Sequence, residues 1–157
     1  MSDADRLATL NTLLEHSEKQ RNEALRQLQE LRARAQAAHD KAQQLGSYRE
    51  EYRQRWTTQF AIGTTVDILG CYQNFGGRLE QAINSQNNVA THADANVQRA
   101  ETKLLECEQR LAAVRKLIER RQIEYQRLEQ HREQKSTDEQ AARTALSSRN
   151  PMMRTPV

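Results

Sequence analysis

Leucine and alanine recur at alternating spacings of three and four residues from Leu7 to Tyr52. With Leu7 taken as heptad position a, nearly every a and d position in this stretch is apolar or aromatic. A stripe with this period must face a partner helix along its whole length. The pattern therefore predicts one long helix, over about residues 3–61. The polar exceptions are Ser17, Arg21 and Arg49.

A second stripe of the same kind runs from Val97 to Leu128, with only Arg121 out of pattern. Read backwards, the same register continues to Gly76. Beyond Leu128 the a and d positions become polar, so we expect the pairing to fray there. The pattern predicts a second long helix, over about residues 67–145.

The break between the stripes, at about residues 62–66, has the residue types of a tight turn between helices. Gly63 suits the position just after a helix, where a left-handed backbone conformation is common. Thr64 or Thr65 suits the N-cap of the following helix. We therefore expect the chain to fold back on itself here.

An antiparallel pairing centred on Thr64 places Leu45 opposite Ile83 and layers the two stripes along their length. A second register, which sets Ala38 against Ile83, is the nearest rival. The first keeps the turn between Gly63 and Thr65 and is preferred. The same stripe could also pair between chains and give a four-helix bundle, so the oligomeric state stays open.

Composition agrees with an all-α protein, a long two-helix antiparallel coiled-coil hairpin. Only 36% of residues are hydrophobic, whereas a globular domain has about 45–50% apolar residues, and 29% are charged. We expect a single domain over residues 1–146 and a disordered C-terminal tail over residues 147–157, which holds both prolines. Neither a secretory signal nor a membrane-spanning segment is recognisable.

Few residues suggest chemistry. Cys71 and Cys107 lie far apart and form no CxxC motif, so we expect two reduced thiols. The four histidines share no metal-binding spacing, and Gly76-Gly77 is not part of a phosphate-binding loop. Carboxylates on a two-helix coiled coil cannot be buried together, so their pKa values would not be separated for acid–base catalysis. The sequence predicts no enzyme activity, no cofactor and no metal.

Two aromatic residues fall outside the stripe. Tyr48 occupies position g of the first helix, and Phe75 and Ala82 occupy g of the second; the two g rows flank the same face of an antiparallel pair. They either shield a seam that is weakened by glycine or form a docking site for a partner protein. Trp56 and Tyr72, closer to the turn, are expected to pack on each other.

A group of basic residues lies late in the second helix, with glutamates among it. Because the 24 basic and 21 acidic residues of the chain are interspersed, this group fits a solvated face better than a nucleic-acid footprint. Docking to an acidic partner is the alternative. The group consists of Arg115, Lys116, Arg120, Arg121 and Arg127.

Two segments beside the turn, QLGSYREEYRQR (Gln44–Arg55) and YQNFGGRLEQAI (Tyr72–Ile83), are similar to the flagellar export protein family FliJ. That family has Tyr-x-x-Glu-Tyr-Arg late in its first helix. Early in its second it has Tyr-Gln-x-Phe-x-x-x-Leu-Glu-x-Ala-Ile. The two motifs cover about a quarter of the chain, and their spacing adds to the match.

The resemblance implies a component of the flagellar type III export apparatus, cytoplasmic and peripheral to the inner membrane at the flagellar base. FliJ proteins resemble the antiparallel coiled coil of the rotary ATPase γ subunit. They bind the hexameric export ATPase as a stalk, link it to the cytoplasmic domain of the export gate FlhA, and interact with export chaperones. No nucleic acid and no direct membrane insertion are implied. A generic coiled-coil scaffold, a needle-type secretion stalk and a nucleic-acid-binding coiled coil are the alternatives.

The family's gate-contacting patch carries over onto eight positions near the turn, although Lys41 and Gln86 are residue types other than those of the family. The open ends of the hairpin would enter the ATPase ring. The gate set is Lys41, Leu45, Tyr48, Tyr52, Phe75, Leu79, Ala82 and Gln86. The ATPase set is Leu7, Leu10, Leu14, Arg115, Lys116, Arg120 and Arg121.

Overall fold

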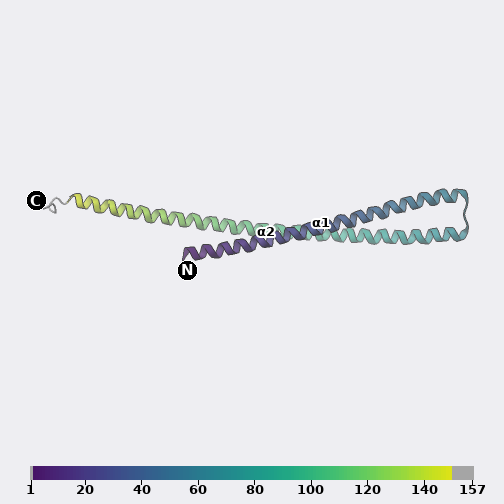
Figure 1. Cartoon of the computed structure of the whole chain (residues 1–157), viewed down its shortest axis with the longest axis horizontal. Coiled ribbons are helices and arrows are strands. Elements are labelled where there is room, and N and C mark those ends of the chain that lie inside the picture. The colour runs from purple at the N-terminus through teal and green to yellow at the C-terminus, as the bar shows by residue number, and fades with distance from the viewer. Residues whose placement is uncertain (1, 150–157) are drawn as a thin grey trace. The chain divides into compact units, whose positions relative to one another are not determined.

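The computed structural model describes residues 2–149, which form two helices joined by a short turn (Figure 1). Helix α1 (Asp3–Ile62) has 60 residues, and helix α2 (Val66–Arg149) has 84. No strand occurs among the described residues. The two helices pack against each other, which confirms the all-α helical hairpin expected from the heptads.

The C-terminal end of α2 differs from the expected boundary. The helix continues to Arg149, so residues 147–149, expected in a disordered tail, are helical. The rest of the expected tail, residues 150–157, lies outside the described residues.

The turn has the backbone geometry that its residues favour. Gly63 has a φ of 116°, in the left-handed region, and its N–H donates to the carbonyl of Phe60 at 3.2 Å. The hydroxyl of Thr65 accepts the N–H of Ile68 at 3.3 Å and so caps α2. The turn is thus centred on Thr64, as in the first of the two registers.

A capping box starts α1. The hydroxyl of Ser2 accepts the N–H of Asp5 at 3.2 Å, and the Asp5 carboxylate accepts the N–H of Ser2 at 3.2 Å and its hydroxyl at 2.8 Å. Each side chain thereby satisfies a backbone donor that the first turn would leave unpaired. The carboxylates of Asp3 and Asp5 also complement the positive end of the helix dipole.

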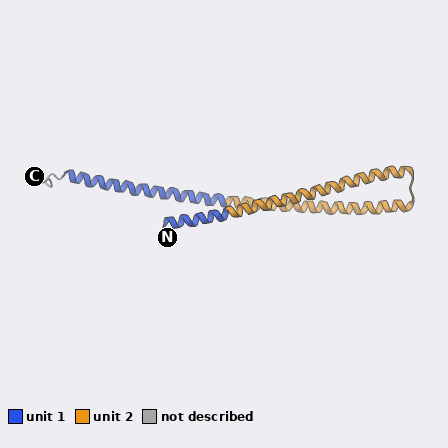
Figure 2. Ribbon diagram, viewed as in Figure 1, with its two compact units in different colours: residues 1–17, 110–157 blue, residues 18–109 orange. Residues whose placement is uncertain are grey.

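The chain divides into two compact units (Figure 2). Unit 2 is residues 18–109, the part of the hairpin that contains the turn. Unit 1 combines residues 2–17 of α1 with residues 110–149 of α2. Within each unit the α1 and α2 segments pack antiparallel on the heptad a and d residues, which we call the seam.

The seam residues are those that the heptads identified. None of the a and d residues of α1 from Leu7 to Tyr52 is exposed, and the same is true of α2 from Gly76 to Ile118. Small residues are frequent, and the Gln86 amide donates across the seam to the backbone carbonyl of Ala38 at 3.0 Å. The buried residues of unit 2 are Ala24, Leu28, Ala35, Ala38, Leu79, Ile83, Ala90 and Cys107, and those of unit 1 are Ser17, Leu111 and Ile118.

The seam of α2 ends earlier than its heptads. Tyr125 and Leu128 continue the pattern but stay 41% and 50% exposed, and every residue from 119 to 149 is exposed. The expectation of a seam to Leu128 is wrong here because α1 begins at Asp3, which lies opposite Tyr125 in this register. The heptad pattern of one helix does not record where its partner ends.

Candidate protein-docking surface

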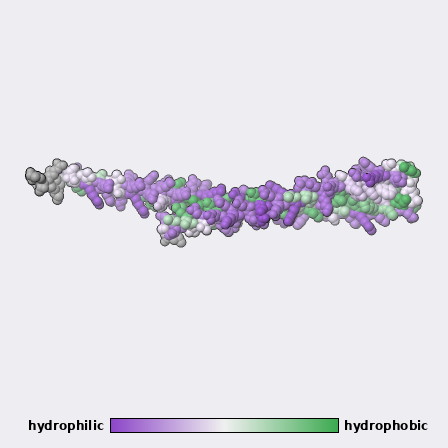
Figure 3. Space-filling model, viewed as in Figure 1, coloured by the Kyte–Doolittle hydropathy of each residue, from purple (hydrophilic) through white to green (hydrophobic). Residues whose placement is uncertain are grey.

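Six of the seven aromatic residues of the chain are in ring contact at the end of unit 2 that carries the turn. Hydrophobic residues also gather beside the turn in the space-filling view (Figure 3). We call the six rings the aromatic cluster: Tyr48, Tyr52, Trp56, Phe60, Tyr72 and Phe75.

Tyr52 is the centre of the aromatic cluster. Its ring centroid lies 4.7 Å from that of Phe75 and 5.3 Å from that of Tyr72, both on α2. On α1 it lies 6.4 Å from Tyr48 and 6.0 Å from Trp56. Centroid separations of about 4.5–7 Å are those of favourable aromatic pairs, each stabilising by about 0.5–1.5 kcal/mol beyond the burial of area. The cluster therefore strengthens a part of the seam that has little aliphatic side chain.

The rings nearest the turn continue the seam. Trp56 and Tyr72 lie 5.7 Å apart, which confirms that they pack on each other, and Phe60 lies 5.4 Å from Trp56 and 5.1 Å from Tyr72. Continuing the heptads past Tyr52 puts Trp56 at a, and continuing them back past Gly76 puts Tyr72 at d. The six rings are therefore one continuous cluster, and not the two groups expected from the sequence.

Tyr48 and Phe75 form the exposed edge of the cluster. Their rings meet edge to face at 6.3 Å, yet 47% of Tyr48 and 39% of Phe75 remain exposed. They come from the g rows of α1 and α2, so both g rows of unit 2 lie on one flank of the seam, the g flank. Large aromatic side chains that are held in place but incompletely covered are typical anchors of protein interfaces.

The other flank of unit 2 is polar and internally paired. Arg32 of α1 bonds Glu101 of α2 at 3.2 Å, and His39 Nε2 lies 2.8 Å from a carboxylate oxygen of Asp94. All four residues occupy e positions, which identifies this side as the e flank. These polar contacts cross the seam, so they help to fix the register.

The eight positions that the resemblance assigns to the gate are not equally accessible. Lys41, Tyr48, Phe75 and Ala82 are exposed, and Leu45, Tyr52 and Gln86 are half-buried. Leu79 is only 6% exposed, and the Gln86 amide is held on the backbone of α1. The exposed four lie along the g flank, while Leu79 and Gln86 support it from within.

A surface depression of about 300 Å³ lies beside the cluster, over Gly76. Apart from the neighbouring backbone of α2, nothing lies within 4 Å of the place where a Cβ of Gly76 would be, and the Tyr52 ring packs on Tyr72 and Phe75. An apolar side chain of a partner could enter this space. The depression is lined by Arg49, Tyr52, Arg53, Tyr72, Gln73, Gly76, Leu79 and Glu80.

Burial in the cluster also affects ionisation. The pKa of Tyr52 is raised above its ordinary value, first because its hydroxyl is partly removed from water and then because Tyr72, Tyr48 and Cys71 surround it. Tyr52 therefore stays neutral at higher pH than a solvated tyrosine.

The residues that the resemblance assigns to the ATPase lie in unit 1. Leu7, Leu10 and Leu14 are half-buried on the seam. The four basic residues of this set are exposed, and Arg121 donates to a Glu124 oxygen at 3.1 Å. A shallow pocket of about 190 Å³ lies at the start of α1, lined by Asp3, Arg6, Leu7, Arg121, Glu124, Tyr125 and Leu128.

Within residues 2–149 the structure brings together no group of three His, Cys, Asp or Glu side chains that could hold a metal ion. Neither described helix has a stretch that is long and apolar enough to cross a membrane.

Comparison with known proteins gives a consistent match. The family model described as flagellar FliJ protein matches residues 6–150. The flagellar FliJ protein of Escherichia coli (strain K12) is 32% identical over 146 residues, which is 93% of this chain and 97% of that protein. The flagellar FliJ protein of Salmonella typhi is 32% identical over 137 residues, 87% of this chain and 93% of that protein. No solved structure matches at a significant level.

Proposed function

Because this chain belongs to the flagellar FliJ family, whose members are components of flagellar protein export, we propose that it is the stalk between the export ATPase and the export gate. In this proposal it binds the hexameric ATPase through unit 1 and the cytoplasmic domain of FlhA through unit 2. It also binds export chaperones, acts by binding rather than by catalysis, and works on the cytoplasmic face of the inner membrane at the flagellar base.

The observation that carries the gate contact is the aromatic cluster. Six rings support one another across the seam, yet the edge formed by Tyr48 and Phe75 faces solvent. Ordered aromatic anchors lose little conformational entropy when a partner covers them. We assign the gate contact to Tyr48, Phe75, Ala82 and Lys41, with Leu45, Tyr52, Leu79 and Gln86 as the layer that holds them.

The ATPase contact rests on unit 1. Its exposed basic residues and the apolar side chains around Leu7 and Tyr125 would lie against the inner wall of a ring, as the resemblance to the rotary ATPase γ subunit suggests. The exposed helix from residue 119 to 149 is a further surface available to the ring or to chaperones.

The gate contact is tested with Tyr48→Ala combined with Phe75→Ala in the full chain. Both side chains are at the edge of the cluster but make three of its ring contacts, so the melting temperature should fall while helicity at the temperature of the titration is retained. Binding to the purified gate domain should weaken at least about a hundredfold, since each anchor is worth roughly 2 kcal/mol. Leu25→Ala combined with Leu105→Ala removes exposed apolar area away from the g flank and should leave affinity unchanged. Equal binding by the Tyr48 and Phe75 variant would exclude this site.

The ATPase contact is tested by adding the chain below stoichiometry to the export ATPase and measuring hexamer assembly and turnover. The stalk role predicts stimulation of both. A variant with Arg115, Lys116, Arg120 and Arg121 changed to Gln should stimulate less while it still binds the gate domain. An ATPase that does not respond to the wild-type chain would contradict the stalk role.

A further inference from the structure

The g flank of unit 2 carries positive charge on both sides of the exposed aromatic edge. Along α1 the g positions are held by Arg34, Lys41, Tyr48 and Arg55, at intervals of seven residues. We call Arg34, Lys41 and Arg55 the basic flank. All three are exposed, and no acidic residue occupies a g position on either helix of unit 2.

The facing g row of α2 is apolar where it runs beside the basic flank. The ring contact between Tyr48 and Phe75 fixes one layer of the two rows. One heptad further from the turn, Lys41 lies level with Ala82, and Val89 follows in the next layer. Ala82 is exposed, and 53% of Val89 is exposed. The g flank thus presents a row of cations on α1 alongside a row of apolar side chains on α2.

The e flank has polar contacts between charged or ionisable side chains of the two helices, and the basic flank has none across the seam. There, the ion pair Arg32–Glu101 and the hydrogen bond between His39 and Asp94 join α1 to α2. The cations of the g flank have no acidic residue in the row that faces them. The seam therefore gains no cross-helix ion pair from the basic flank, in contrast to the e flank.

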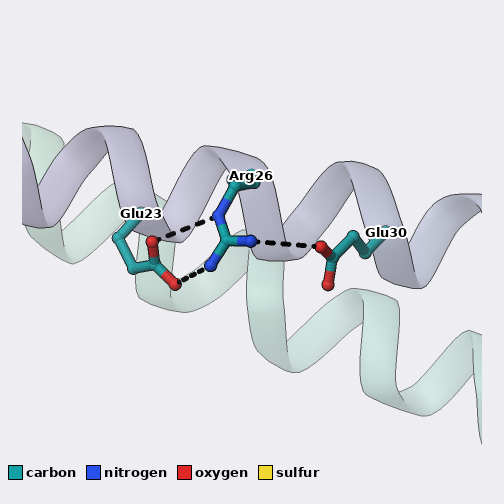
Figure 4. A network of polar contacts seen from close by, with 3 residues as sticks. All are labelled: Glu23, Arg26 and Glu30. Atoms are coloured by element: carbon teal, nitrogen blue, oxygen red, sulfur yellow. Dashed lines mark hydrogen bonds and ion pairs between the residues drawn. The ribbon is translucent and has the colours of Figure 1, made fainter.

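The carboxylates near the basic flank form no ion pair with its three residues. Glu30, one turn before Arg34, is engaged by Arg26, which donates to Glu30 at 3.3 Å and to Glu23 at 2.6 and 3.2 Å (Figure 4). This hydrogen bonding by Arg26 is the main cause that lowers the pKa of Glu23. Glu51 lies one turn before the last cation of the row and is exposed. None of the three residues of the basic flank forms an ion pair within unit 2.

We propose that the g flank binds an amphipathic helix of the same partner protein that docks on the aromatic edge, with acidic residues of that helix on the basic flank. Its apolar residues would cover the α2 row from Phe75 to Val89. The inference rests on the proposed function and goes beyond it by giving the partner's chemistry. Exposed positive charge without an internal partner is complementary to carboxylates of matching spacing.

The geometry favours a helix over a broader polyanion. From Arg34 to Arg55 the α1 row is about 30 Å long, with one residue every two turns in a narrow line. A helix that lies alongside, with acidic residues at seven-residue intervals and an apolar face next to them, matches both rows. Duplex DNA would gain nothing from the apolar row. A membrane surface is broader than this narrow row of cations.

The test measures affinity of the full chain for the purified gate domain at about 0.05 M and 0.5 M NaCl. Arg34→Gln combined with Arg55→Gln leaves Lys41, Tyr48 and Phe75 intact. Its affinity should fall about fivefold at low salt and differ little from wild type at high salt, because exposed ion pairs are screened.

The matched control is Lys19→Gln combined with Arg32→Gln. It removes the same charge from position f and from the e flank of α1, where both side chains are exposed. Its affinity for the gate domain should equal that of the wild-type chain at both salt concentrations. An equal loss in the control and in the Arg34 and Arg55 variant would show that net charge, and not the basic flank, attracts the partner, and would overturn the inference.

The remaining outcomes separate this inference from the proposed function. If the Arg34 and Arg55 variant binds as wild type while Tyr48→Ala with Phe75→Ala loses binding, the docking site stands and the acidic helix is overturned. If the aromatic variant retains affinity, the proposed site itself fails. Vesicles containing phosphatidylserine and a duplex DNA are assayed in parallel. Loss of binding to either of these, with the gate domain unaffected, would assign the basic flank to that polyanion instead.

Discussion

Arg49 of α1 reaches across the seam to Glu80 of α2 and places its Nη1 atom 3.0 and 3.1 Å from the two carboxylate oxygens. Arg49 occupies an a position, where an apolar residue would be usual, and its Nε is buried without a hydrogen-bond partner. A polar residue on a coiled-coil seam lowers stability but helps to fix the register and the number of chains. We therefore interpret this pair as a device that holds the hairpin in one register.

Replacing Arg49 with leucine should raise stability by about 1 kcal/mol, because it removes the unpaired Nε and adds apolar contact beside Tyr52. Glu80 is left alone but is half exposed, so water can solvate it. Thermal and urea unfolding of Arg49→Leu measure the gain. Glu80→Ala is the converse control and should destabilise by about 0.5 kcal/mol, since it leaves the Arg49 charge without its partner. Sedimentation of Arg49→Leu should also reveal self-association, and a strictly monomeric variant would argue against the register role.

The adjacent glycines Gly76 and Gly77 offer a matched pair. Both are inside α2, and apart from the neighbouring backbone of α2 nothing lies within 4 Å of the position of an added Cβ at either. Each change to alanine should therefore stabilise the helix by up to about 1 kcal/mol. Only Gly76 lines the depression beside the aromatic cluster.

If a partner side chain enters that depression, Gly76→Ala should weaken gate-domain binding several-fold, whereas Gly77→Ala should not. Circular dichroism melting curves and calorimetric titration of both variants measure the two effects. Equal affinities for the two variants would show that the depression stays empty in the complex.

The helices, the turn and the buried residues could be predicted because each depends on local pattern. The a and d residues from Leu7 to Tyr52 are covered, as a repeat of 3.5 residues requires. Gly63 ends α1 because glycine readily adopts a positive φ, and Thr65 begins α2 because its hydroxyl caps the helix. The aromatic edge at Tyr48 and Phe75 could be predicted as well, because g residues of antiparallel helices share a flank.

What the sequence did not predict depends on the partner helix. Tyr125 and Leu128 fit the seam pattern, and only the start of α1 at Asp3 explains their exposure. The preferred register sets Tyr52 opposite Gly76 but does not predict where the Tyr52 ring lies. It could have filled the space over Gly76, but it packs on Tyr72 and Phe75 because aromatic contact is gained there.

The raised pKa of Tyr52 predicts a loss of stability in alkali. Because burial favours the neutral phenol, the folded-state pKa lies above the unfolded value of about 10. The contribution of neutral Tyr52 to folding stability is fully present below the unfolded pKa and is lost as pH rises through the folded pKa. Melting temperature should therefore fall above about pH 10, and less steeply in Tyr52→Phe than in wild type.

Tyr125→Phe is the control for this alkaline transition. The pKa of Tyr125 is also raised, first by its hydrogen bond to the Glu129 carboxylate on the same helix, but the side chain lies outside the covered part of the seam. Absorbance at the tyrosinate band should lose a late-ionising tyrosine in either variant, and the fall in melting temperature should flatten more in Tyr52→Phe than in Tyr125→Phe, because Tyr125 bonds only to its own exposed helix. An identical alkaline melting profile for wild type and Tyr52→Phe would contradict the assignment.

The exposed end of α2 should contribute almost nothing to the stability of the hairpin. Every residue from 119 to 149 is exposed, and the α1 segment of unit 1 begins at Asp3, opposite Tyr125. A chain that stops after Gln130 should therefore melt within about 2 °C of the full chain, because isolated helix ends gain little from tertiary packing. Its helical signal should drop in proportion to the residues removed. A chain that stops after Ala113 loses the buried Ile118 and should melt clearly lower. If the two truncations melted alike, cover by α1 would not determine where the stabilising part of α2 ends.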